Sequence, residues 1–399
     1  MINRPDYIAA IEPFIDKPLV KILAGIRRCG KSTIFEMLRE ELLRRGIGED
    51  QIICKRYTEM DIPENITAKQ MYDELTAAMA GKGHCYLLLD EIQEITGWEK
   101  AVNSLLESAD ADIYVTGSNS KLMSSEISTY LTGRYVSIPV YTLSFKEYLD
   151  FKADSTLSRR ELLEEYIRFG GFPIVALSEY DEQSAYQIVN GIYHTVVSRD
   201  IVKRHRINKQ DLFDRVVKYI IENMGKTFSA NSISTFLKSE HRKVSVESIY
   251  NYLRWLEQAL IIYPCERYDL QGKSILKTQE KYYLADVSLK YALLGYNRKM
   301  LDGAMENIVY LELKRRGYDV YIGKNDTKEI DFVATRRAER IYVQVCVRIP
   351  ETSDREVGNL MEIRDHYPKY VVTLNEMDTG IENGIKIVHL ADFLLAEAW

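Results

Sequence analysis

The sequence lacks the cysteine patterns that build disulfide frameworks and zinc sites. Its five cysteines are odd in number and widely spaced, and no two form a C-x-x-C pair. Small secreted scaffolds and structural zinc sites depend on even cysteine counts or on close pairs. We therefore expect reduced thiols and a cytoplasmic protein.

Long apolar runs and an excess of basic residues are also missing. No run of about 18 apolar residues is available for a membrane-spanning helix, and the first residues, MINRPDYIAAIEPFI, carry charges where a signal peptide needs an apolar core. The net charge is −6, which argues against coating of DNA by the whole surface but allows a local basic patch. We expect no membrane partner.

No low-complexity tract or fixed-period repeat stands out in the 399 residues. A prior of roughly 150 residues per domain predicts two or three domains. The composition, 46% hydrophobic and 28% charged, is typical of a globular chain.

A phosphate-binding motif is present near the start of the chain. GIRRCGKST fits the pattern G-x-x-x-x-G-K-[ST] through Gly25, Gly30, Lys31 and Ser32. The preceding PLVKILAG predicts a buried strand, and STIFEMLREELLRRG predicts a helix that ends near Gly46. The candidate nucleotide-binding residues are Gly25, Ile26, Arg27, Arg28, Cys29, Gly30, Lys31, Ser32 and Thr33.

The residue types in this loop are those that bind phosphate and Mg²⁺. Its glycines allow backbone N–H groups to point at a phosphate, and the helix N-terminus adds partial positive charge. Lys31 is expected to reach the β- and γ-phosphate oxygens, and the Ser32 hydroxyl to bind Mg²⁺. Arg27 and Arg28 either contact phosphate or face water.

Acidic and polar residues follow two later buried strands. HCYLLLDEIQEI ends a strand in Asp90 and Glu91, which predicts a magnesium ligand followed by a residue that orients the attacking water. ADIYVTGSNSKL predicts another strand, with Ser118 and Asn119 at its tip. In additional-strand P-loop ATPases, which this order of motifs resembles, a polar residue at this position senses the γ-phosphate, so Ser118 and Asn119 are candidates for that role. Arg134 could stabilise the transferring phosphoryl group, in its own chain or in a neighbouring one.

Together these segments resemble a broad family of bacterial and archaeal AAA-type P-loop ATPases of the additional-strand class. The matching segments are GIRRCGKST, LLLDEIQ, VTGSNS, LTGRY and YTLSFKEYL, followed by GGFP, VVSRDIVKR and YYLADVSLKYALLG. Members carry a C-terminal domain of unknown function. The resemblance implies ATP with Mg²⁺, and it places Lys31, Ser32, Asp90 and Glu91 at the nucleotide and catalytic positions. No guanine-specifying N-K-x-D element is present.

The predicted fold is α/β, with four domains. A three-layer αβα P-loop domain spans 1–155, a helical lid or connector 156–208, a winged-helix domain 209–285, and a nuclease-like α/β domain 286–399. The winged-helix prediction rests on three periodic helices, the last capped by Ser245, and two strand-like runs around DLQGK. Its third helix, with Glu247, Asn251, Arg254 and Glu257, either reads DNA or has a structural or protein-binding role.

The last segment resembles the core of PD-(D/E)xK nucleases and departs from it at two positions. Glu306 fits the first helix and Asp331 the first strand, but Gln344 and Cys346 stand where that core has an acid and a lysine. Arg348, two places further, would point to the same face of a strand. We expect a vestigial, inactive site of Glu306, Asp331 and Gln344.

Three functional hypotheses follow. The first is an ATPase whose hydrolysis changes how the C-terminal half binds a partner, with DNA as the leading candidate. The second is a nucleotide-dependent switch or scaffold that binds protein. The third is an ATP-regulated nuclease. The oligomeric state stays open, with a homo-oligomer as one alternative.

Overall fold

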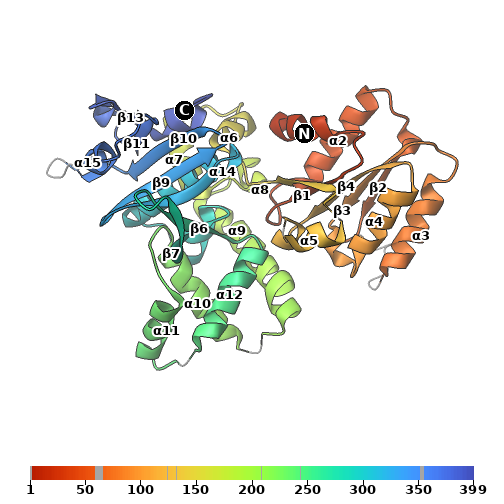
Figure 1. Ribbon diagram of the computed structural model, residues 1–399, viewed down its shortest axis with the longest axis horizontal. Helices are drawn as coiled ribbons and strands as arrows, with labels where there is room; N and C mark the ends of the chain where they lie inside the picture. Colours follow the sequence, from red (N-terminus) through yellow and green to blue (C-terminus); the bar gives the residue numbers. More distant parts are fainter. Residues whose placement is uncertain are drawn as a thin grey trace. The chain divides into compact units, whose positions relative to one another are not determined.

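The computed structural model describes residues 2–58, 66–123, 125–131, 133–207, 209–242, 244–350 and 355–399. The chain forms two compact units (Figure 1), the first of Met1–Val140 with Gln258–Leu260, and the second of Tyr141–Glu257 with Ile261–Trp399. Each unit contains its own sheet. The fold is α/β: a parallel five-stranded core, then a helical region, then a mixed sheet.

The first unit is built on five parallel strands in the order β2-β3-β4-β1-β5. The strands are β1 (Val20–Ala24), β2 (Ile52–Arg56), β3 (Cys85–Asp90), β4 (Ala111–Gly117) and β5 (Tyr135–Pro139). The central strands are almost wholly buried because helices cover both faces. The strand predicted before the phosphate loop is confirmed as β1.

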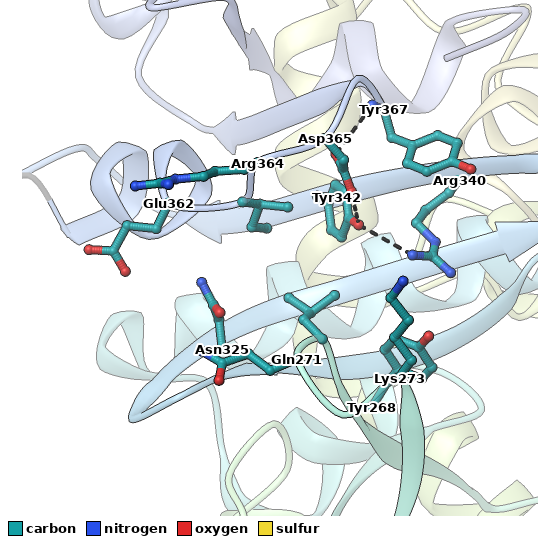
Figure 2. Close-up of a pocket in the computed structure, with 12 residues that line it drawn as sticks. Tyr268, Gln271, Lys273, Asn325, Arg340, Tyr342, Glu362, Arg364, Asp365 and Tyr367 are labelled. Atoms are coloured by element: carbon teal, nitrogen blue, oxygen red, sulfur yellow. Dashed lines mark hydrogen bonds between the residues drawn. The ribbon is translucent and has the colours of Figure 1, made fainter.

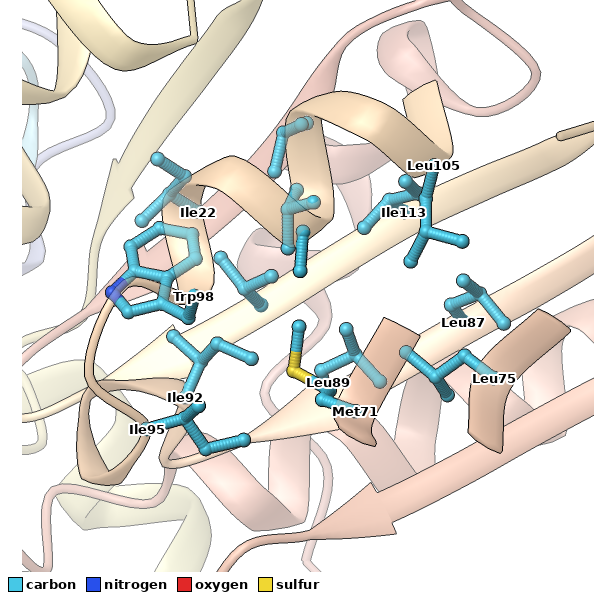
Figure 3. Packing of buried hydrophobic residues seen from close by; sticks show 14 of the residues in the cluster. Ile22, Met71, Leu75, Leu87, Leu89, Ile92, Ile95, Trp98, Leu105 and Ile113 are labelled. Carbon is cyan, nitrogen blue, oxygen red and sulfur yellow. The ribbon is translucent and has the colours of Figure 1, made fainter. Parts of the chain in front are cut away.

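Helices lie on both sides of this sheet. They are α1 (Pro5–Ile11), α2 (Lys31–Arg44), α3 (Ala68–Met79), α4 (Trp98–Ser108) and α5 (Ser125–Tyr130). Figure 1 shows α2 on one side and α3 and α4 on the other. On the second side, Leu87 and Leu89 of β3 pack against Met71, Leu75 and Trp98 (Figure 3). Alternate residues of one strand therefore share a layer, and the residues between them face the opposite layer.

The second unit begins with helices. They are α6 (Phe145–Phe151), α7 (Arg159–Phe169), α8 (Pro173–Ala176), α9 (Glu182–Val196), a π-helical continuation (Val197–Lys203), α10 (Gln210–Glu222), α11 (Ala230–Ser239) and α12 (Val246–Gln258). The predicted break at Gly170 and Pro173 is confirmed by the end of α7 and the start of α8. The predicted cap of α12 is confirmed too, because the Ser248 N–H donates to Ser245 Oγ at 3.1 Å.

Two of the family segments meet at a buried carboxylate. Asp286, from YYLADVSLKYALLG, accepts the Gly171 N–H of GGFP at 2.8 Å. Gly170 has φ +71°, and a Cβ there would lie 1.8 Å from Asp286 Oδ1. Only glycine meets both demands at position 170, and at Gly171 a Cβ would lie 2.4 Å from the Leu143 carbonyl oxygen.

The remaining strands form one mixed sheet in the order β12-β13-β11-β10-β9-β8-β6-β7. They are β6 (Ile262–Asp269), β7 (Ser274–Leu284), β8 (Asp319–Asn325), β9 (Lys328–Arg336), β10 (Glu339–Cys346), β11 (Lys369–Thr373), β12 (Gly380–Glu382) and β13 (Ile385–His389). The β6–β7 hairpin, predicted as a wing, pairs through β6 with β8. It therefore belongs to the same sheet as the strands predicted to be nuclease-like.

Four further helices accompany these strands: α13 (Ser288–Leu294), α14 (Leu301–Arg315), α15 (Arg355–Met361) and α16 (Leu390–Leu395). The tail was predicted as helix, strand, turn, strand, helix; the structure adds the short strand β12 within the turn region. In the described ranges no helix combines the length and apolarity needed to cross a membrane. The predicted domain boundary at Asn208 lies outside the described residues.

Candidate functional site: the phosphate loop and its acidic partner

The phosphate loop joins the carboxyl end of β1 to the first turn of α2. A Cβ at Gly25 would lie 2.1 Å from the Val140 carbonyl oxygen, so this position tolerates only glycine. Arg28 has φ +67° and Gly30 φ +103°. Such alternation of backbone conformation forms concave nests of N–H groups that bind anions.

Lys31 opens α2 and its side chain is buried. Its ammonium donates to the Gly25 carbonyl at 3.0 Å and the Ile26 carbonyl at 3.3 Å. It also lies 3.7 Å from Glu91 Oε1. The cation is thus positioned inside the loop that the sequence predicts for phosphate.

Ser32 and Asp90 come together although 58 residues separate them. The Ser32 hydroxyl donates to Asp90 Oδ2 at 2.7 Å. Asp90 also accepts the Thr116 hydroxyl on its other oxygen, and Arg56 Nε lies 3.1 Å from Asp90 Oδ2. Two oxygen donors of the type that Mg²⁺ prefers therefore meet beside the loop.

Glu91 is held in place by both its backbone and its side chain. It has φ +55°, rare for a residue with a Cβ, and its N–H donates to Thr116 Oγ1 at 3.0 Å. Its carboxylate accepts the Gln93 amide and the Ser118 hydroxyl, the latter at 3.3 Å. Burial favours the protonated acid, but the Lys31 ammonium and these donors together lower the pKa of Glu91. The group is therefore a carboxylate at neutral pH.

The tip of β4 reaches the same loop. The Gly25 N–H donates to the Gly117 carbonyl at 3.2 Å, which brings the segment carrying Ser118 and Asn119 next to the phosphate loop. Both side chains are buried. The predicted sensor residues thus lie at the carboxyl edge of the sheet with Asp90 and Glu91.

The other loop residues differ in their surroundings. Arg27 pairs with Glu94 at 3.2 Å. The Cys29 thiol is fully buried, which raises its pKa and argues against a reactive thiolate. The Cys29 carbonyl accepts the side chain of Arg4 at 2.8 Å. Ile26 is buried and Thr33 half-buried.

Arg134 lies at the amino-terminal ends of the strands, opposite to the ends that carry the phosphate loop. It precedes β5, which runs parallel to β1, and its carbonyl accepts the N–H of Val20, the first residue of β1. The phosphate loop follows the last residue of β1, about 16 Å further along a five-residue strand. The Arg134 guanidinium binds Asn103 at 3.0 Å and Glu107 at 2.6 Å.

This placement corrects half of the prediction for Arg134. The residue cannot act on a nucleotide bound in its own chain, because parallel strands put their two ends at opposite edges of the sheet. Action in a neighbouring subunit stays a prediction.

Sequence reasoning missed three residues of this site. Thr116 binds both Asp90 and Glu91, Gln93 binds the Glu91 carboxylate, and Arg56 reaches Asp90. Thr116 and Gln93 lie in the segments VTGSNS and LLLDEIQ, where only their polar side chains could have indicated a role in the site. Arg56 becomes visible only through the register of β2 on β3, which pairs it with Asp90.

The predicted vestigial residues of the second unit also lie on the expected elements, Glu306 on α14, Asp331 on β9 and Gln344 on β10. Gln344 Oε1 accepts the Asp331 N–H at 3.3 Å, and Asp331 Oδ2 accepts the Val345 N–H at 2.8 Å. Burial and the nearby Glu306 raise the pKa of Asp331 well above its usual value.

A buried lysine from another strand joins this cluster. Lys281 of β7 lies 3.3 Å from Glu306 Oε2 and 2.9 Å from Glu329 Oε1, and its side chain is 4% exposed. The Tyr283 hydroxyl donates to Glu306 at 3.1 Å. The expected replacement cation, Arg348, lies beyond β10, which ends at Cys346, so strand alternation does not place it. Lys281 was missed because it lies 25 residues before Glu306 on a different strand.

Comparisons with known proteins agree with this geometry. A family model described as an AAA domain matches residues 17–149, and a domain of unknown function, DUF8612, matches residues 160–299. An uncharacterized protein of Haemophilus influenzae is 36% identical over 398 residues, covering 99% of both chains. Uncharacterized protein MJ1544 of Methanocaldococcus jannaschii is 32% identical, covering 85% of this chain and 77% of that one.

A solved structure shares the fold. The Walker-type ATPase paby2304 of Pyrococcus abyssi aligns with a TM-score of 0.53 and 15% identity, covering 73% of this chain and 96% of that one. At this identity the likeness concerns the fold alone. With the family matches, it follows that the chain belongs to the AAA-domain P-loop ATPases that carry a DUF8612 domain after the ATPase domain.

Proposed function

We propose that the first unit binds ATP with Mg²⁺ at the carboxyl edge of its sheet and hydrolyses it. The observation that carries this proposal is the hydrogen bond of 2.7 Å between Ser32, at the start of α2, and Asp90, at the end of β3. It joins the two predicted magnesium ligands beside the buried ammonium of Lys31. Family membership supports ATP as the nucleotide.

Different residues of the site bind the phosphates and the Mg²⁺ ion. Backbone N–H groups of residues 25–33 and the N-terminus of α2 face the phosphates, and Lys31 exchanges its carbonyl contacts for phosphate oxygens. Ser32 and Asp90 would hold Mg²⁺, which neutralises phosphate charge when bound. Arg56 must release Asp90, because a cation that binds this carboxylate competes with the guanidinium.

Glu91 accepts a proton from, or orients, the attacking water. Its lowered pKa keeps it ionised, and Gln93 and Ser118 fix the direction of its carboxylate. Asn119, at the tip of β4, senses the γ-phosphate. Arg134 stabilises the phosphoryl group of a neighbouring subunit in a homo-oligomer.

The substitution Glu91→Gln tests this assignment. The amide keeps the size of the side chain but cannot take a proton, so the variant should bind ATP and hydrolyse it orders of magnitude more slowly. Turnover is measured by phosphate release and binding by titration with a fluorescent ATP analogue. Glu36→Gln, on the exposed side of α2, is the matched control and should leave both unchanged. Unchanged turnover in Glu91→Gln would show that another residue orients the water.

We further propose that hydrolysis changes the conformation of the C-terminal half, which binds a partner. In this proposal 1–155 form the ATPase domain, 156–208 a lid, 209–285 a winged-helix domain and 286–399 a nuclease-like domain. The order α10, α11, α12 and then the antiparallel β6–β7 hairpin supports the winged-helix part. DNA is the leading partner, and a protein partner is the alternative.

Filter binding with a salt titration separates these partners. Phosphate contacts release counterions, so affinity for DNA should fall steeply with salt. No DNA binding at low salt would leave the protein-binding switch as the better proposal. In that case the ATPase assignment stands, because the Glu91→Gln experiment tests it separately.

Nuclease activity is not part of the proposal. Glu306 is bound by Lys281 and Tyr283, and Gln344 uses its amide oxygen to accept the Asp331 N–H. The acids are thus paired inside the protein, and a neutral amide stands where a carboxylate would bind metal. Magnesium-dependent cleavage of DNA that Asp331→Ala abolishes would contradict this conclusion.

A further inference from the structure

A polar pocket of about 470 Å³ opens on the mixed sheet of the second unit. Its lining comes from the β6–β7 hairpin, the end of β8, the start of β10 and the loop between α15 and β11. Figure 2 shows Arg340 and Lys273 at one end of the pocket and Arg364 and Glu362 at the other. The volume falls within the roughly 300–1,000 Å³ of small-molecule sites.

The two acids of the lining are already neutralised. Asp365 accepts the Tyr342 hydroxyl at 2.6 Å and lies 3.3 Å from Lys369 Nζ. Glu362 forms an ion pair with Lys328. Neither lysine lines the pocket. These carboxylates therefore do little to repel an anion.

The three cations of the lining are in the opposite situation. Lys273, Arg340 and Arg364 form no ion pair with any carboxylate in the part of the chain that the structure describes. The charge not balanced inside the pocket is therefore positive. Cations gathered in a concave, partly desolvated site attract anions more strongly than the same cations spread over a surface.

Arg340 is held ready for an anion. Its guanidinium carbon lies 5.5 Å from the ring centre of Tyr268 and 5.4 Å from that of Tyr367. Its Nη1 makes one long contact of 3.5 Å with the Tyr342 hydroxyl, and its buried Nε has no hydrogen-bond partner among the described residues. The rings of Tyr268 and Tyr367 thus hold the Arg340 guanidinium in place, which reduces the entropy that it loses on binding a ligand. The planar guanidinium presents several N–H donors in a geometry that matches phosphate oxygens.

The other lining residues could bind a nucleobase, which is a flat ring with hydrogen-bonding groups at its edges. Tyr367 is 41% exposed and offers a face for stacking. Gln271 and Asn325 bring side-chain amides, which can donate and accept as the edges of nucleobases require. Aromatic stacking combined with cationic contacts to phosphate is the usual way in which proteins bind single-stranded nucleic acid.

We propose that this pocket binds one phosphorylated nucleoside, with Arg340 and Lys273 on the phosphate and Tyr367 and the amides on the base. The nucleoside comes from a free nucleotide or from a single nucleic-acid strand. The proposal deepens the suggested nucleic-acid role of the C-terminal half, and it is independent of ATP hydrolysis.

The test uses the full chain with Lys31→Ala, so that the phosphate loop binds no nucleotide. Binding of a fluorescein-labelled dT oligonucleotide is measured by anisotropy, and TMP is titrated by calorimetry. We expect Arg340→Gln to weaken binding about tenfold or more, since a charge-assisted pair is lost. Tyr367→Ala should weaken it several-fold and Tyr367→Phe should restore it, because the ring is retained.

Arg160→Gln on α7, whose side chain is 73% exposed, is the control and should leave this binding unchanged. Arg254→Gln tests the alternative that α12 binds the oligonucleotide. Circular dichroism melting of each variant confirms that the second unit is folded. Binding of TMP, and its competition with the oligonucleotide, would identify a free-nucleotide site; binding of the oligonucleotide alone would identify a strand site. The proposal that this pocket binds a nucleotide is contradicted if neither probe binds. It is also contradicted if Arg254→Gln, rather than Arg340→Gln, weakens binding. The second result would move nucleic-acid binding to α12 without removing it from the chain.

Discussion

Replacing Lys281 by methionine should strongly destabilise the second unit. The ammonium lies 3.3 Å from Glu306 and 2.9 Å from Glu329 in a side chain that is 4% exposed. Each pair contributes about 5 kcal/mol of Coulomb attraction at an effective dielectric constant of about 20. Much of this gain is offset by the cost of removing the charges from water, so the net attraction of the pairs is small.

Removing one partner is different from removing the whole cluster. Methionine has a similar length but no charge, so Glu306 and Asp331 would remain buried without their cation. Breaking a buried pair in this way costs about 3–5 kcal/mol. For a unit of this size that corresponds to a fall in melting temperature of roughly 10 °C.

Differential scanning calorimetry measures this fall in melting temperature. The double variant Lys281→Met/Glu306→Gln should recover much of the loss, since it removes one of the acids left without the cation. Loss of Lys281 also raises the pKa of Glu306, because burial already raises it and the ammonium opposes that shift. The folded variant then binds more protons than the unfolded chain, so the cost should grow as pH rises.

Two results would refute this reasoning. A melting temperature of Lys281→Met within about 1 °C of the parent would mean that the cluster is well solvated. A double variant that melts as low as the sum of the single losses would mean that the two side chains do not interact.

Four other predictions concern single residues. Lys31→Ala should abolish binding of a fluorescent ATP analogue, and retained affinity would contradict the assignment of the loop. Gly25→Ala should lower the melting temperature of the first unit, since its Cβ would lie 2.1 Å from a carbonyl oxygen; overpacking of this kind costs about 1–3 kcal/mol. Arg134→Ala should cost less than about 1 kcal/mol, because its pair with Glu107 is solvent-exposed, and it should leave hydrolysis by dilute monomer unchanged. Burial lowers the pKa of Lys290 to about 8, so the unfolded state binds more protons between about pH 8 and 10.5 and stability should rise across that interval; in Lys290→Met this increment of about 3 kcal/mol should be absent from calorimetric melts.

The first site could be predicted from the sequence to a large extent because its parts are local. The glycines, Lys31 and Ser32 lie within one loop, and Asp90 and Glu91 follow directly after an apolar strand. Parallel strands bring their carboxyl ends to one edge, so motif order alone placed these residues together. The same rule, applied to Arg134, would have placed it at the far edge, because Arg134 comes before its strand.

Other contacts depend on which strands become neighbours. Arg56 reaches Asp90 only because β2 pairs with β3 in one register. Lys281 reaches Glu306 only because the β6–β7 hairpin joins the mixed sheet through β8. Pairing of this kind is decided by packing over long sequence separations, which no local pattern reports.

By itself, therefore, the sequence determined the phosphate loop, the acid pair and the family, since backbone geometry and strand direction turn those short patterns into positions. The tertiary structure alone decided the contact of Arg56 with Asp90, the buried lysine among the acids, and the pocket around Arg340. Those features join side chains from separate strands and loops, and only the folded sheet brings their charges within reach of one another.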